Sequence, residues 1–206
     1  MQKGFSPMPY QPRRTWKIVT QPQSEPVTLA EAKANLSVDF TDDDSMIEDL
    51  IVAAREDAEL FTRRGFITQT WDLFLECFPS NDFRDEIEIP ISPLQSITSV
   101  KYLDNDGVQQ TMSASDYIVD TSSEPARIRP AYNTSWPSTR DQMNAIEVRF
   151  VAGYGDATDV PKAIKAAINM HVAGLYEHRE ANTDIKVEDN PAASRLLWKH
   201  RVLESF

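Results

Sequence analysis

The feature that most constrains this chain is a change of hydrophobic period on either side of Gly65. Over residues 44–64, apolar side chains recur at three- and four-residue steps, which predicts an amphipathic helix: Met46, Ile47, Leu50, Ile51, Ala54, Ala58 and Phe61. From Ile67 to Glu76, apolar and polar residues alternate, which predicts a strand. The chain therefore passes from helix to sheet at Gly65, which can adopt the left-handed conformation that ends a helix.

A shorter helix is predicted just before the long one. Thr28 is a good N-cap and Glu31 follows three residues later, so the two form a capping box. Residues 42–45, three aspartates and a serine, then supply cap side chains and negative charge for the start of the long helix.

The middle of the chain is typical of antiparallel sheet. Short alternating stretches predict strands at 69–78, 86–91, 97–103, 108–112, 116–120, 126–129 and 145–152. Residues 104–107 read Asp-Asn-Asp-Gly, a strong hairpin-turn signal. Calcium loops also combine spaced acids with a glycine, but the closing bidentate glutamate is absent here and the flanks predict strands. We therefore interpret residues 104–107 as a turn.

Helical periodicity returns after these strands. The Gly153-Tyr154-Gly155 sequence lacks a following lysine and precedes two acids, so it predicts a turn rather than a phosphate cradle. Asp159 and Pro161 are expected to start a helix, and Pro191 a last short one.

These patterns predict an α+β fold: a helical bundle from the N- and C-terminal parts with a β-rich antiparallel insertion. The predicted domains are an extended N-terminal arm at 1–26, a helical domain from 27–66 and 156–206, and the inserted β-rich domain at 67–155. The arm holds five prolines and is expected to be extended. Trp16 is its candidate apolar anchor, on a stretch that alternates enough to add a strand to a neighbouring subunit; an unattached tail is the alternative.

The net charge of -11 is unevenly distributed along the 206 residues. Segments 1–26 and 191–206 carry +3 and +2, so the rest of the chain carries -16. An acidic body argues against tight nucleic-acid binding through the folded part. No apolar run approaches the roughly 20 residues of a membrane span, and a signal peptide is not expected. Cys77 is the single cysteine, which excludes an intrachain disulfide.

No catalytic signature stands out. His171 and His178 lie two helical turns apart, whereas a metal pair on a helix needs a spacing of four. No histidine is placed with a serine or cysteine motif, and no cofactor loop is present. A carboxylate pair leaves no sequence signature among so many acids. We predict that the protein is not an enzyme, has no cofactor and has no metal site.

Several stretches in fixed order resemble the head–tail connector family of tailed bacteriophages, also called adaptor or head-completion proteins. They are VTLAEAK at 27–33, DDD at 42–44, TRRGFITQTW at 62–71, PLQSITSV at 93–100, FVAGYG at 150–155 and the helix opening at Val160-Pro161. No single stretch is specific, but their order is. The resemblance covers roughly residues 27–180.

The resemblance implies a structural subunit of a ring, usually twelve-fold in that family, in the virion neck. Such a ring is assembled in the bacterial cytoplasm, joins the portal protein to the next neck or tail protein (a stopper or tail terminator), and extends the DNA channel. DNA passes through it without specific binding, and no membrane is involved.

Two sets of interface residues follow as hypotheses. In the resembling family the C-terminal segment engages the portal, so the apolar and basic residues of the last helix are candidate contacts: Leu196, Leu197, Trp198, Arg201, Val202 and Phe206. Packing of this helix on the subunit's own core is the alternative. Asp49, Glu56 and Glu59 are candidates to line an acidic channel, unless they merely solvate an outer face.

A different class of function stays open at this point. The chain could be a monomeric β-sandwich module that binds carbohydrate or protein, with Trp71 and Trp136 as an aromatic platform. Another neck or tail-completion protein is a further alternative. Association distinguishes the two classes: a ring subunit assembles or joins a portal, whereas a binding module stays monomeric and shows affinity for its ligand.

Overall fold

The computed structural model describes residues 13–79, 85–178 and 191–203. Its elements in chain order are β1 (Arg14–Thr20), α1 (Leu29–Leu36), α2 (Asp44–Thr62), β2 (Gln69–Leu75), β3 (Ile87–Glu88), β4 (Leu94–Leu103), β5 (Gln109–Thr111), β6 (Tyr117–Asp120), β7 (Arg127–Pro130), β8 (Ile146–Ala152), α3 (Lys162–Glu177) and α4 (Pro191–Trp198).

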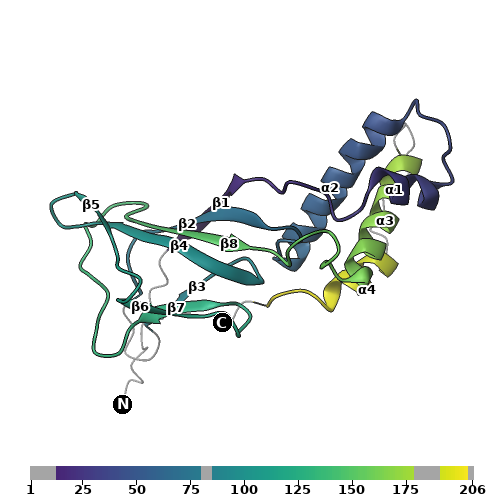
Figure 1. The fold of residues 1–206 in the computed structure, drawn as a ribbon. Helices are drawn as coiled ribbons and strands as arrows, with labels where there is room; N and C mark the ends of the chain where they lie inside the picture. Colours follow the sequence, from purple (N-terminus) through teal and green to yellow (C-terminus); the bar gives the residue numbers. More distant parts are fainter. Residues whose placement is uncertain (1–12, 80–84, 179–190, 204–206) are drawn as a thin grey trace, which may run out of the picture.

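Two antiparallel sheets form one part of the molecule. The larger has the strand order β1-β2-β8-β4-β5 and the smaller the order β3-β7-β6. Figure 1 shows the smaller sheet as a second layer beneath the larger one. Because side chains alternate along each strand, Leu73 and its partner Val148 face the same side, where they are buried between the sheets with Ile128.

The helices gather beyond one end of the sheets (Figure 1). Their apolar stripes meet in a second core, in which Ile47 and Ile51 of α2 pack with Ile164 and Ile168 of α3. Phe66, in the turn between α2 and β2, is fully buried in this core, so the long helix is anchored where it meets the sheet.

The prediction of a helical bundle with a β-rich insertion is wrong, although the α+β class holds. The described residues form four helices and two sheets with eight strands, so the molecule is β-rich. In addition, β1 precedes every helix of the described residues yet pairs along β2, with Trp16 opposite Leu73. The larger sheet therefore does not arise from one inserted segment.

Local signals at several element ends are confirmed. The Thr28–Glu31 capping box forms, with the Glu31 N–H donating to Thr28 Oγ1 at 3.2 Å and the Thr28 N–H donating to Glu31 Oε2 at 2.8 Å. In the predicted turn at 104–107, the Gly107 N–H donates to the Asp104 carbonyl at 2.9 Å. The Asp104 carboxylate accepts bonds from the Asp106 and Val108 N–H groups and from Gln110, so it serves the turn.

Two predicted caps are wrong. Arg63, not Gly65, takes the left-handed conformation at the end of α2 (φ 56°). The Gly65 N–H instead donates to the Ser92 carbonyl at 3.0 Å, a long-range bond that local sequence does not reveal. Asp159 does not cap α3, since its carboxylate accepts from the Asp156 N–H at 2.9 Å and Pro161 is the N-cap residue.

Candidate interaction surfaces at the helical end

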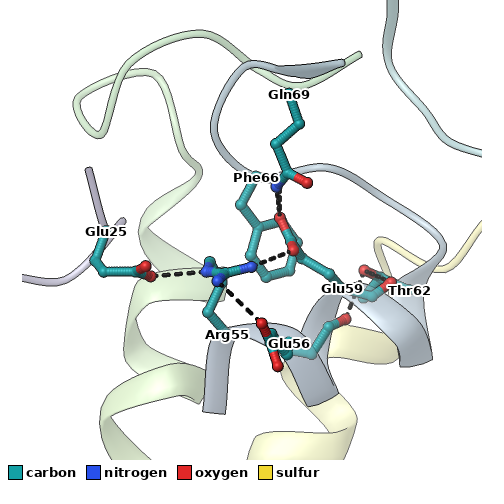
Figure 2. Close-up of polar contacts among 8 residues, drawn as sticks. Glu25, Arg55, Glu56, Glu59, Thr62, Phe66 and Gln69 are labelled. Carbon is teal, nitrogen blue, oxygen red and sulfur yellow. Dashed lines mark hydrogen bonds and ion pairs between the residues drawn. The ribbon is translucent and has the colours of Figure 1, made fainter. Parts of the chain in front are cut away.

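A buried polar network joins α2 to the strand that follows it. Glu59 is only 7% exposed and accepts three bonds of 2.7 Å, from Arg55 Nη1, the Phe66 N–H and Gln69 Nε2. The Arg55 Nε donates at 2.7 Å to Glu25, which lies in the segment between β1 and α1. Figure 2 shows these side chains converging on Arg55 and Glu59 from three parts of the chain.

Burial of the network shifts the pKa values of its carboxyl groups. Burial raises the pKa of Glu59 and of Glu25, while Arg55 and the hydrogen-bond donors around them oppose that rise. A buried guanidinium needs carboxylate partners, and Arg55 has two within 2.7 Å. The network therefore fixes how α2, the N-terminal segment and β2 meet.

A second arginine, Arg64, ties the C-terminal segment to this junction. Its Nε donates to the His200 carbonyl, and its two Nη atoms donate to the carboxylate of Glu124, which lies between β6 and β7. The Val202 N–H also donates to the Thr62 carbonyl at 2.9 Å. The residues after α4 are thus held against the end of α2.

The side of α4 that faces the molecule is apolar. Ala193 and Leu197 are buried in the helical core with α2 and α3. Trp198 lies on the outer side, with its ring centroid 6.1 Å from that of Phe61. The Arg201 guanidinium carbon lies 5.3 Å from the Phe61 ring centroid and 5.1 Å from the Trp198 centroid, within cation–π range of both.

The exposed charges at the helical end differ in sign from one helix to another. Every exposed charged side chain of α1 and α2 is acidic: Glu31, Glu48, Asp49, Glu56 and Asp57. From α4 to residue 203, the exposed charged side chains are all basic: Arg195, Lys199 and Arg201.

The structure divides the six candidate portal contacts. Leu197 and Val202 are buried and Leu196 packs on the helical core, so these three stabilise the subunit itself. Trp198 and Arg201 are exposed. Phe206 lies outside the described residues.

The candidate channel acids also separate. Asp49 and Glu56 are exposed on α2, whereas Glu59 belongs to the buried network and cannot face a channel in this conformation. The candidate arm anchor Trp16 is half-buried against the core between the sheets, because β1 pairs with the chain's own β2. Residues 1–12 of the predicted arm lie outside the described residues.

The aromatic platform of a carbohydrate-binding module does not form. Trp71 faces the core between the sheets. Trp136 stacks on Phe78 with ring centroids 4.6 Å apart and an interplanar angle of 6°, and its Nε1 donates to the Asp85 carbonyl at 3.2 Å. The buried Trp71 cannot share a platform with Trp136, and Phe78 covers one face of the Trp136 indole.

The histidines of α3 are not brought together. His171 lies 3.7 Å from the Asp57 carboxylate, while His178 is the exposed C-cap residue. Among the described residues, no three His, Cys, Asp or Glu side chains are grouped so that they could hold a metal ion. Within the same residues, no helix is both long and apolar enough to cross a membrane.

The structural roles of Arg55 and Arg64 were not predicted from the sequence. The four-residue spacing of Arg55 and Glu59 was a visible signal for an ion pair on one helical face. No local signal pointed to the bond from Arg64 to Glu124, because 60 residues separate them.

The chain is similar in sequence to known head–tail connector proteins. The family model described as phage gp6-like head-tail connector protein matches residues 26–125. The resemblance to head–tail connectors is confirmed. A curated relative, head completion protein gp6 of Enterobacteria phage HK97, is 38% identical over 45 residues. That match spans 22% of this chain and 42% of the relative.

Solved structures of low sequence identity share the fold of nearly the whole chain. A chain in the neck of an empty GTA particle, computed with C6 symmetry, gives a TM-score of 0.76 at 20% identity and covers 93% of this chain and 97% of that one. A chain in the virion of a native gene transfer agent (GTA) particle gives 0.74 at 19% identity with the same coverage. A chain in the neck of a native GTA particle, computed with C12 symmetry, gives 0.72 at 18% identity.

Proposed function

We propose that this protein is a structural subunit of a head–tail connector in the neck of a tailed phage or phage-like particle. The observation that carries the proposal is the connector-family match over residues 26–125. A fold shared over 93% of this chain with a protein from the neck of a GTA particle supports it. The matching family is one of structural proteins, so we infer a structural rather than a catalytic role.

We also propose that the subunits form a closed ring in the host cytoplasm. Neck structures that share the fold were computed with C6 and C12 symmetry, which supports a ring of identical subunits and, for this chain, a twelve-fold one. We further propose that the ring binds the portal protein on one side and a stopper or tail terminator on the other.

The ring would also extend the DNA channel without binding DNA specifically. The net charge of -11 per subunit supports this, since an acidic assembly repels phosphate. Asp49 and Glu56 remain candidates for such a wall.

The test is removal of the gene from the phage or prophage that encodes this chain. We expect DNA-filled heads without attached tails in electron micrographs, and restoration of tailed particles when the full chain is supplied in trans. Tailed particles at wild-type abundance in the deletion strain would contradict the proposed function.

A further inference from the structure

The outward side of α2 combines acids with exposed apolar surface. Asp49, Ala53, Glu56 and Leu60 follow one another at steps of four, three and four residues, so they lie along one stripe of the helix. All four are exposed, and Leu60 is 76% exposed. We call these four residues the acidic face.

The end of α4 and the residues that follow it present the complementary combination. Arg195, Trp198, Lys199, Arg201 and Leu203 are all exposed, with Trp198 at 58% and Leu203 at 66%. We call these five residues the basic face. Its arginine at position 201 is already ordered by stacking on Phe61 and Trp198, so less conformational entropy is lost when a partner binds it.

A closed ring of more than two identical subunits requires two different surfaces that fit each other, because each copy contacts its neighbours head to tail. The acidic and basic faces meet this requirement: each offers a large exposed apolar side chain, and their charges are opposite. Unlike charges around an apolar centre favour one orientation of docking and disfavour contact between two like faces.

We propose that the basic face of one copy docks on the acidic face of a second copy. The occupant of the basic face is therefore another subunit, and Leu60 contributes apolar contact area to the Trp198 side chain of its neighbour. This inference rests on the proposed connector ring and specifies its subunit contact. It is an alternative to the proposal that Asp49 and Glu56 line the channel, because the subunit contact would cover the same carboxylates.

The test uses the full chain with paired charge reversals. One variant carries Asp49→Lys and Glu56→Lys; the other carries Arg195→Glu and Arg201→Glu. Sedimentation velocity measures association, and circular dichroism with thermal melting checks folding. The matched control is Asp106→Lys with Asp141→Lys, which alters two exposed acids outside the helices.

We expect each variant alone to associate at least about tenfold more weakly than the wild type, because like charges then face each other. An equimolar mixture of the two variants should associate again, since every junction between unlike copies pairs opposite charges. Rescue in the mixture requires both variants to be folded, so it separates a contact effect from misfolding. The control should assemble as the wild type does.

Three outcomes would overturn the inference: a wild-type chain that stays monomeric at its highest soluble concentration, variants that each associate normally, or a mixture that fails to associate. Loss of portal binding by the Arg195→Glu, Arg201→Glu variant with its rings intact would assign the basic face to the portal instead. Tailless heads in the deletion strain, together with normal association of both variants, would leave the connector function standing and reject only this contact.

Discussion

At the scale of single residues, Arg55 illustrates how a buried charge can hold a junction together. Replacing Arg55 with alanine leaves Glu59 buried without a cation, so we expect a loss of about 3–5 kcal/mol of unfolding free energy. Glu56→Ala is the matched control: Glu56 is exposed and 3.5 Å from Arg55, so its removal should cost less than about 1 kcal/mol. Urea denaturation of both variants measures the difference, and equal losses would contradict a role for the network.

The same network predicts a pH dependence with a definite sign. Burial raises the pKa of Glu59 above its value of 4.5 in an unfolded chain. Between those two pKa values the folded chain binds more protons than the unfolded chain, so stability falls as the pH rises through that window. The Glu59→Gln variant lacks this titration and should show a flatter decline from pH 4.5 upward. Parallel stability profiles for the two proteins would refute the assignment.

Two glycines with opposite surroundings give a paired prediction. Gly153 has φ +137°, and a Cβ there would collide with the backbone of Ile67 and Thr68, where the chain enters β2. Gly153→Ala should therefore cost more than about 2 kcal/mol. A Cβ on Gly174, inside α3, would meet nothing within 4 Å, so Gly174→Ala should stabilise by about 0.5–1 kcal/mol. Thermal melting of both variants checks the opposite signs.

At the scale of elements, local periodicity predicted more than long-range pairing did. Alternation along Trp71, Leu73 and Leu75 identified the buried face of β2, because burial on a pleated strand repeats every two residues. The position of β1 was not predictable from its own residues, since its partners in β2 lie far along the chain, from Arg14 opposite Leu75 to Thr20 opposite Thr70. The sequence pattern likewise predicted Glu59 as a solvent-facing acid, because its partners Phe66 and Gln69 lie beyond the helix.

The pairing of β1 changes what an N-terminal truncation should do. A chain starting at residue 21 loses β1, so β2 becomes an edge strand that pairs only with β8. The inward side of Trp71 is then less covered. We expect lower thermal stability and aggregation, whereas a chain starting at residue 13 retains every described strand and should melt as the full chain does. Equal solubility and melting of both truncations would show that β1 contributes little to the fold.

At the scale of the whole molecule, a local group of basic residues contrasts with a negative net charge. Arg195 of α4 and the following Lys199 and Arg201 are close in the sequence, but they belong to a chain with a net charge of -11. Long-range attraction of a polyanion depends on the summed field, and the field around this chain is dominated by acids.

The division into helical and β-rich domains stays a prediction, which stepwise unfolding of the two cores would support.

This charge balance makes a prediction about DNA. The full chain should show no binding to duplex DNA in fluorescence anisotropy at about 0.15 M salt. The few basic side chains in and after α4 could neutralise only a few phosphates, and the acidic side chains of α1 and α2 would repel others. Any weak binding at low salt should disappear steeply as salt is added and should be lost in the Arg195→Glu, Arg201→Glu variant. The Asp49→Lys, Glu56→Lys variant is the counterpart, since four units of added positive charge should raise low-salt binding. Tight, salt-resistant binding of DNA by the wild type would be incompatible with a channel through which DNA passes freely.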